Sequence, residues 1–570
     1  MKTNVDKYKW FLALVLLVLI TPVHIAGIDK FATLDEPWWV ISGSNYYYAL
    51  THQDFEHTIY DYHPAVTTTW VVAAGMVSYF PSYRGLGQGY FDVRKPLFEN
   101  FMREQGKDAL PLVRNSRLIQ VGLLIVLALL SFFLLQMLVD EMAAFLAVVL
   151  AMNAPFFLGI SRLVNHEGML AMFVLVGLLG MQVYLNKDRK LIYLFVSGAA
   201  FGLAQLTKSS SIVLLALIVL ILFVELFKQN AESLTFKIWS AVKIFVIWFA
   251  VAIFVYVLLW PGMWVAPGKM LYEVFGNAFS YAFQGARLDV TRELQPSSFN
   301  IVAGIGGITQ YINRWITSST VISWLGLIFI PLIFVSKDKS LTPAPMRSTI
   351  TYLIIVAALF IVLFGMVQGR DSAYYILSSF LSLDIVAGVG WAVALFWAKK
   401  RWAILRLKRA DILTIPLLVL IVFQLGSSLM YYPYYFTYKN PFVKQGGVHG
   451  YGEGLDQAAG YLAKKGNAKD LRVIAYAARG CFSYFFPGKS DLLKIGFYED
   501  GLPYVEEIQN ADYLVLYPIR QNTKADGVEL MRVLQNVSPE HTIFIDEIEY
   551  ARIYNVADLP EDIYNILLRE

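Results

Sequence analysis

The stretch that decides the fold runs from residue 202 to residue 227 and reads GLAQLTKSSSIVLLALIVLILFVELF. Within it, Lys208 separates two apolar runs, 191–207 and 209–227, with almost no loop between them. Each run has close to the roughly 20 residues that cross a hydrocarbon core of about 30 Å. A charge held at membrane depth is expected to be functional. The stretch therefore predicts a membrane protein that keeps a functional lysine where two spans meet.

The rest of the chain continues this pattern. Of its 570 residues, 57% are hydrophobic and 16% are charged, and the mean hydropathy is +0.53, which lies outside the range of soluble globular proteins. We predict an α-helical polytopic membrane protein with eleven spans, at about 10–28, 118–139, 142–161, 168–186, 191–207, 209–227, 244–263, 315–336, 348–369, 374–398 and 412–431. A net charge of +4 is too small for this length to suggest nucleic acid as a partner. The single cysteine, Cys481, excludes an intrachain disulfide framework.

A twelfth apolar segment, 64–82, is a weaker candidate because it contains three consecutive threonines and a proline at its start. Eleven spans place five basic segments on the cytoplasmic side, as the positive-inside rule requires, whereas a span at 64–82 would move four of them outside. Seven Lys and Arg residues in 83–117 argue the other way. We therefore expect 64–82 to be an interfacial or re-entrant helix in a large external loop, 29–117.

This map predicts two domains, a membrane domain over 1–431 and a small extracytoplasmic α/β domain over 432–570. In the second, 446–454 reads as a loop and the following LDQAAGYLAKKG as an amphipathic helix ending at Gly466. Three segments rich in β-branched and aromatic residues read as strands: LRVIAYAA, ADYLVLYP and HTIFIDEIEYARIYNV. The expected location is the plasma membrane, with the N-terminus in the cytoplasm.

Unusual polar residues gather on the external side of this map. Asp35 and Glu36 follow the first span, although Asp35 before Pro37 also fits a helix N-cap. His63-Pro64 also reads as an ordinary turn into the interfacial helix. Arg162, His166 and Glu167 sit in a short connection between two spans and must lie close to the membrane surface.

Five motifs in this order carry a family resemblance: LDEPWW (34–39), HPAV (63–66), SRLVNHEGML (161–170), GLAQLTK (202–208) and GRDSAYYIL (369–377). Together they resemble the GT-C class of polytopic glycosyltransferases, with the protein O-mannosyltransferases of glycosyltransferase family 39 and the lipid A aminoarabinose transferases as the nearest families. The resemblance covers roughly residues 10–400.

The resemblance implies a site. Asp35 would be the catalytic base with Glu36 as its neighbour, and Glu167 would be a second acidic position, where the family usually has Asp. Lys208, Arg370 and His63 would bind the donor phosphate, although Ala65 replaces the second proline of the family's HPP element. Arg162 and His166 would support them. The motifs name no certain cofactor, and a divalent metal ion stays open as an addition to the site.

The implied reaction has a physical logic. Transfer of a hexose or pentose from a polyprenyl-phosphate donor releases a phosphate, whose growing negative charge needs fixed cations such as Lys208 and Arg370. The acceptor hydroxyl, on a protein, a lipid or a glycan, needs a carboxylate such as Asp35 to take its proton. Attack opposite the phosphate would invert the anomeric centre. The donor and the surrounding membrane lipids are thus the expected partners.

Two alternatives stay open. A transporter or lipid-linked-sugar flippase would use Asp384, in the middle of the tenth span, as its coupling residue. A receptor or anchor for the C-terminal domain would need neither eleven spans nor Lys208. The aromatic residues after the first span fit an interfacial belt or a sugar-stacking surface: Trp38, Trp39, Tyr46, Tyr47 and Tyr48.

Overall fold

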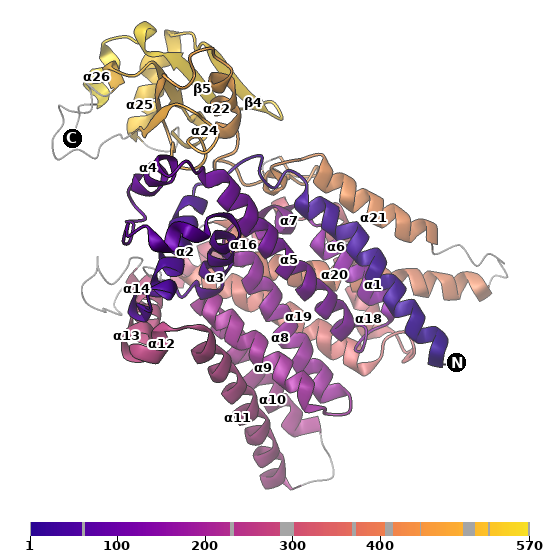
Figure 1. Cartoon of the computed structure of the whole chain (residues 1–570). Coiled ribbons are helices and arrows are strands. Elements are labelled where there is room, and N and C mark those ends of the chain that lie inside the picture. Colours follow the sequence, from indigo (N-terminus) through magenta and orange to yellow (C-terminus); the bar gives the residue numbers. More distant parts are fainter. Residues whose placement is uncertain are drawn as a thin grey trace. The chain divides into compact units, whose positions relative to one another are not determined.

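The computed structural model describes residues 2–59, 63–228, 233–284, 301–367, 372–404, 414–444, 446–493, 508–521 and 525–567 (Figure 1). The chain forms two compact units, and the boundary between them passes within helices α2 and α5. The helical unit comprises Met1–Ala26, Gly43–Gln88 and Ser116–Gly447. The α/β unit comprises Gly27–Ser42, Gly89–Asn115 and Val448–Glu570. Two parts of the predicted external loop therefore pack with the C-terminal residues.

The long elements of the helical unit follow the apolar runs of the sequence. They are α1 (Lys2–Ile25), α2 (Glu36–Thr51), α3 (Val66–Tyr79), α5 (Ala109–Leu135), α6 (Glu141–Met152), α7 (Pro155–Ser161), α8 (Glu167–Asn186), α9 (Leu191–Thr207), α10 (Ile212–Lys228), α11 (Leu234–Leu259), α16 (Ile301–Ser318), α17 (Val321–Ile328), α18 (Ile330–Val335), α19 (Ala344–Met366), α20 (Leu377–Ile404) and α21 (Thr414–Leu429). Short helical turns connect them: η1 (Phe55–His57), η2 (Pro81–Gly85), η3 (Ser209–Ser211), α12 (Gly262–Val265), α13 (Pro267–Leu271), η4 (Tyr272–Gly276), α14 (Asn277–Gln284), η6 (Ala373–Ile376) and η8 (Tyr435–Thr437).

Seven helices of the described residues are long and apolar enough to cross a membrane, or up to nine if each of two bent helix pairs is one span. The shorter apolar helices α9 and α21 coincide with two more of the predicted spans. The predicted α-helical polytopic membrane fold with a small α/β part is confirmed. One predicted span, 315–336, has a different form: it starts inside α16, and the chain bends by 110° between Ser318 and Val321.

Helix α3 lies in the segment predicted to be interfacial. Its 14 residues rise about 21 Å at 1.5 Å per residue, less than the roughly 30 Å of a hydrocarbon core. Its length therefore agrees with a helix that does not cross, and the membrane topology of this segment stays a prediction.

Helix α8 occupies the centre of the helical unit. All residues from Glu167 to Tyr184 are buried, and the helix contacts α9, α10, α19 and α20 (Figure 1). A helix that is apolar on every side is expected in such an inner position. On α9, a Cβ at Gly198 would lie 2.5 Å from the carbonyl oxygen of Trp248, and one at Gly202 would lie 2.6 Å from that of Ala252. These two glycines let α9 and α11 pack with their backbones in contact, as small residues do between membrane helices.

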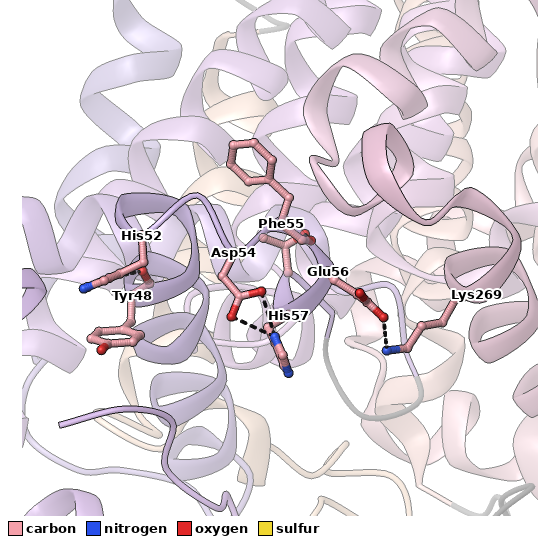
Figure 2. A network of polar contacts seen from close by, with 8 residues as sticks. Tyr48, His52, Asp54, Phe55, Glu56, His57 and Lys269 are labelled. Atoms are coloured by element: carbon pink, nitrogen blue, oxygen red, sulfur yellow. Dashed lines mark hydrogen bonds and ion pairs between the residues drawn. The ribbon is translucent and has the colours of Figure 1, made fainter. Parts of the chain in front are cut away.

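A polar network on the helical unit ties the turn after α2 to α13 (Figure 2). Lys269 Nζ lies 2.8 Å from Glu56 Oε1, and His57 Nδ1 lies 2.8 Å from the carboxylate of Asp54. The hydrogen bond and charge of Lys269 lower the pKa of the Glu56 carboxyl. Because these side chains are exposed, the pairs fix the local connection and add little stability.

The α/β unit contains a five-stranded sheet in the order β2-β1-β3-β5-β4. Its strands are β1 (Arg472–Ala475), β2 (Lys489–Leu492), β3 (Tyr513–Leu516), β4 (His541–Ile545) and β5 (Ile548–Asn555), and its helices and turns are α4 (Leu97–Glu104), α22 (Leu455–Ala463), α24 (Pro518–Gln521), α25 (Ala525–Val533), η9 (Leu534–Asn536), η10 (Val556–Asp558) and α26 (Asp562–Leu567). Strand β1 pairs in parallel with β2 and β3, whereas β5 is antiparallel to β3 and β4.

Both faces of this sheet are covered by apolar side chains. Val473 and Val515 belong to one buried cluster, whereas Ile474 and Leu514 belong to another. This division follows from the strand period of two, which points neighbouring side chains to opposite faces. The helix after 454 and the strands in LRVIAYAA and ADYLVLYP are confirmed, whereas HTIFIDEIEYARIYNV forms two antiparallel strands, β4 and β5, joined by a turn. Strand β2 was missed because its sequence, KSDL, is polar and occupies a sheet edge.

Candidate active site

Lys208 ends α9 and precedes the turn η3, so it lies at the break between two apolar helices. Its side chain is 3% exposed and forms an ion pair with Glu167. The ammonium nitrogen also lies 5.2 Å from the ring centre of Phe364 and 4.6 Å from that of Tyr375. Both distances are within the range of a cation–π contact. The lysine is therefore a buried cation with defined partners.

Glu167 begins α8 and joins Lys208 to two histidines. Its Oε1 lies 3.1 Å from Nε2 of His166, and the ring centre of His166 lies 5.2 Å from that of His63. The amide N–H of Ala65 donates to the carbonyl oxygen of Thr207, at 3.3 Å, which holds the HPAV motif beside the end of α9. The structure thus brings together four predicted site residues from three separate motifs: His63, His166, Glu167 and Lys208.

Arg162 holds the polypeptide around this cluster. It is fully buried, and its guanidinium donates to the carbonyl oxygens of Ala26 (2.5 Å) and Pro433 (2.8 Å). Its charge also lies 4.4 Å from the ring centre of Tyr435. These contacts join three segments of the helical unit, and the supporting role of Arg162 stays a prediction. Arg370, the other predicted phosphate ligand, lies outside the described residues.

Asp35 and Glu36 belong to the α/β unit, whereas His63, His166, Glu167 and Lys208 belong to the helical unit. Glu36 is fully buried, and its Oε2 accepts hydrogen bonds from the backbone N–H (2.8 Å) and the hydroxyl (3.0 Å) of Thr33. The Glu36 carboxylate thereby satisfies two donors of Thr33, in the residues just before α2. Glu36 therefore secures the start of α2.

The carboxylate of Asp35 has a different partner. Its Oδ2 accepts a hydrogen bond of 2.7 Å from the phenol of Tyr451, and the amide N–H of Leu34 donates to the carbonyl oxygen of Tyr451 at 3.1 Å. The carbonyl oxygen of Asp35 accepts from the amide N–H groups of Trp38 and Trp39, which matches the backbone role of an N-cap. Asp35 thus both starts the helix and presents its side chain to Tyr451.

Sequence reasoning missed Tyr451, although its signal was the glycine-rich GYGEG at 450–454. Gly452 has a φ of 117°, and a Cβ there would lie 2.9 Å from the carbonyl oxygen of Ala32. Glu453 folds back to accept from the N–H groups of Gly450 (2.5 Å) and Tyr451 (2.8 Å). The loop needs glycine at 452 because only glycine permits both this φ and this close approach.

Glu453 is the buried centre of this loop. Burial raises the pKa of its carboxyl to about 7, and the hydrogen bonds from backbone N–H groups oppose that rise only in part. The phenol of Tyr517 donates to the carbonyl oxygen of Glu453 at 3.1 Å and accepts from the N–H of Gly452 at 3.2 Å. The loop that carries Tyr451 is thus fixed from both sides.

We searched the described residues for side chains that could bind a metal ion together. There, no three or more His, Cys, Asp and Glu side chains lie close enough together to hold an ion. His166 and Glu167 are neighbours, but their nearest charged partner is Lys208, a cation that opposes a metal ion at the same carboxylate.

Comparisons with known proteins bear on these motifs. Residues 113–261 match the sequence model of the family described as dolichyl-phosphate-mannose-protein mannosyltransferase. This range contains Arg162, His166, Glu167 and Lys208. A search of curated protein sequences finds no match.

Solved structures of low sequence identity also align. ArnT from Cupriavidus metallidurans, bound to undecaprenyl phosphate, is 12% identical, with 95% of this chain and 97% of that chain covered and a TM-score of 0.47. An oligosaccharyltransferase from Archaeoglobus fulgidus is 13% identical, with 97% and 74% covered and a TM-score of 0.47. The S. cerevisiae Pmt1-Pmt2 complex, bound to the sugar donor, is 15% identical, with 49% and 36% covered and a TM-score of 0.34.

All three TM-scores lie below 0.5, so these structures support no conclusion about this chain. The family match falls on the segment in which the buried ion pair and its histidine form. Over residues 113–261, the chain resembles the dolichyl-phosphate-mannose-protein mannosyltransferases, as its motifs predicted.

Proposed function

We propose that the chain is an integral membrane glycosyltransferase that moves a sugar from a polyprenyl-phosphate donor to an acceptor hydroxyl. The observation that carries this proposal is the buried Lys208 at the break between α9 and α10, in the segment that matches a mannosyltransferase family. A cation at this position is suited to a phosphate whose lipid tail lies among apolar helices. The reaction would take place on the extracytoplasmic side of the plasma membrane, with the N-terminus in the cytoplasm.

Lys208 would stabilise the leaving phosphate. As the bond between the anomeric carbon and the phosphate oxygen breaks, negative charge grows on that oxygen, and a preorganised cation lowers the energy of this state. Glu167 makes a buried lysine tolerable before the donor arrives, because an unpaired charge in this setting would be costly. His166, which lies beside Glu167, and His63, which lies beside His166, would donate further hydrogen bonds to the phosphate. Arg370 is proposed as a second cation.

Asp35 would be the general base. A carboxylate next to the acceptor hydroxyl takes its proton as the oxygen attacks the anomeric carbon, from the face opposite the phosphate. This displacement inverts the anomeric centre and needs no covalent sugar–enzyme intermediate. The phenol of Tyr451 donates to one carboxylate oxygen of Asp35, at 2.7 Å, and would hold the carboxylate in place for this proton transfer. Glu36, which is bonded to Thr33, is proposed as a structural neighbour of the base.

The test is direct transfer. Purified chain in detergent is incubated with radiolabelled sugars on polyprenyl phosphate and with peptide, lipid and glycan acceptors. The radiolabel that has left the polyprenyl phosphate is then separated from the donor by chromatography and counted. Sugar should leave the lipid in the presence of the wild-type chain and much more slowly with Lys208→Met. Donor lipid that stays intact with every sugar and acceptor class, while the chain remains folded, would count against the proposal.

A further inference from the structure

The α/β unit contains a cavity made of two pockets that share three lining residues. One part, of about 540 Å³, lies between α4 and the segment 483–487, and the other, of about 360 Å³, lies between α4 and strand β2. Both parts are lined by Glu99, Arg103 and Ser483. These volumes fall within the range of pockets for small molecules. None of the residues implied by the family motifs lines either part.

The lining carries an excess of positive charge. Seven of the lining residues are basic and three are acidic: Arg94, Lys95, Arg103, Lys107, Lys469, Arg479 and Lys489 against Glu99, Asp108 and Asp491. Asp491 already has a partner outside the lining, because Nε of Arg472 lies 3.3 Å from its Oδ2. Burial raises the pKa of the Glu99 carboxyl, and the Ser483 hydrogen bond and the two arginines Arg479 and Arg103 oppose this only in part. The cavity therefore favours an anion.

Two of these cations are held rigidly. The guanidinium of Arg103 donates to the carbonyl oxygens of Ser483 (2.8 Å), Phe486 (3.3 Å) and Gly488 (3.1 Å). Arg479 donates in the same way to Val93 (2.8 Å) and Lys95 (3.0 Å). These bonds join the 89–115 segment to the connection between β1 and β2, but carbonyl groups carry no net charge. They fix the two positive charges at the cavity without neutralising them.

Two buried polar atoms in the lining have hydrogen-bonding capacity that the described protein groups do not use. Glu99 is 9% exposed; its Oε2 accepts from the Ser483 hydroxyl at 2.6 Å, whereas its Oε1 has no hydrogen-bond partner in the described residues. Nε of Arg479 is likewise a buried donor without a partner there. Both residues line the 360 Å³ part. A carboxyl group and a guanidinium on one cavity wall suit a ligand that has both a hydroxyl and an anionic group.

We propose that this cavity binds an acidic saccharide, in which a phosphate or a carboxylate lies beside sugar hydroxyls. The anionic group would contact Arg479, Lys95 and Lys489, and a hydroxyl would bond to Glu99. The ligand is the acceptor, or part of it, if the chain transfers sugar as proposed above. Binding at the cavity does not depend on that transfer, so each proposal can fail without the other.

Binding is measured by isothermal titration on the purified full chain in detergent, with no donor lipid present. Four probes separate the chemistries: glucose 6-phosphate, glucuronate, glucose and inorganic phosphate. Glucose 6-phosphate or glucuronate should bind at least about tenfold more tightly than glucose and than phosphate, because neither of these offers both groups. The acid that binds more tightly identifies the source as a phosphorylated or a uronic acid glycan. Equal binding of all four, or of none, overturns the proposal.

The double variant Lys95→Gln/Lys489→Gln removes two exposed cavity charges and leaves the backbone bonds of Arg479 in place. It should weaken binding of the acidic sugar by about tenfold or more. The matched control is Lys464→Gln, which removes an exposed lysine of the same unit that does not line the cavity. Glu99→Gln should retain phosphate binding and lose the preference for the sugar. The same affinity in the control and the double variant would contradict the proposal, and thermal unfolding of each variant verifies that it is folded.

Discussion

Tyr451 and Asp35 are 416 residues apart in the sequence, and the phenol of Tyr451 donates a hydrogen bond of 2.7 Å to the Asp35 carboxylate. The Tyr451→Phe variant removes this bond and little else. A hydrogen bond to a charged group contributes roughly 1.5–3 kcal/mol, so turnover should fall by about 10- to 100-fold with a nearly unchanged KM for the donor. Steady-state transfer kinetics measure this.

The control is Tyr461→Phe, which removes a phenol that bonds to Glu540 in the same unit. It should transfer sugar at the wild-type rate. If both variants slow transfer equally, Tyr451 acts on general stability and not on Asp35.

Asp35→Asn keeps the size of the side chain and can still accept a hydrogen bond, so α2 should form normally. Loss of the base should lower turnover by roughly 10² to 10⁴ while donor binding persists. Glu36→Gln keeps an oxygen that accepts from Thr33 and should remain active. Single-turnover assays separate binding from transfer. An active Asp35→Asn beside an inactive Glu36→Gln would exchange the two roles.

Lys208→Met removes the cation and leaves the buried Glu167 without its lysine, with His166 as its remaining partner, which is itself destabilising. The double variant Lys208→Met/Glu167→Gln avoids that charge and tests the phosphate role. It should fold and lose about 2 to 4 kcal/mol of transition-state stabilisation, seen as a fall in kcat/KM for the donor. Wild-type kinetics in the folded double variant would remove Lys208 from the site.

Asp384 distinguishes a transferase from a transporter. It is 3% exposed in α20, and the hydroxyl of Ser323 donates to its Oδ1 at 2.5 Å. Asp384→Asn keeps an oxygen for this bond and should leave sugar transfer within about twofold of wild type. Transfer is measured in detergent and lipid-linked sugar movement in vesicles. If Asp384→Asn abolishes the movement of lipid-linked sugar across the vesicle membrane and the wild-type chain transfers no sugar, the flippase alternative is supported.

Glu453 should make stability depend on pH. Its pKa is about 7 in the folded chain and near its ordinary value of 4.5 when unfolded, so the folded state binds more protons between these values. The free energy of unfolding should therefore be greatest below about pH 4.5. It should fall by a total of about 3 kcal/mol as the pH rises toward 7 and then level off. Thermal unfolding of the full chain at several pH values measures this slope. In Glu453→Gln, whose side chain cannot ionise, the stability should depend less on pH. If the variant and the wild-type chain have the same pH dependence, other groups cause it.

The topology of the segment 64–82 can be tested at Gln105, an exposed position after α4. If α3 does not cross the membrane, a Gln105→Cys residue should react with an impermeant thiol reagent applied to intact cells. Cys481 is fully buried, and Cys481→Ala removes the remaining background. Reaction only after lysis would place residue 105 in the cytoplasm and require α3 to span.

The sequence by itself determined the membrane class, the helices that follow apolar runs, the strands rich in β-branched residues and the position of Lys208 between two spans. These features depend on local composition and period, which are set before any long-range contact forms. Strand β2 was not predicted because an edge strand does not need an apolar pattern.

Only the tertiary structure decided which distant residues meet. Glu167 pairs with Lys208 across 41 residues, and Tyr451 reaches Asp35 across 416. Similarly, α4 lines the basic cavity because the 89–115 segment packs with the C-terminal sheet. Such pairings depend on how helices and strands pack, and one sequence does not specify which of many polar side chains will share a buried space. The reason is physical: a buried polar group needs a partner, and packing decides which one comes within reach.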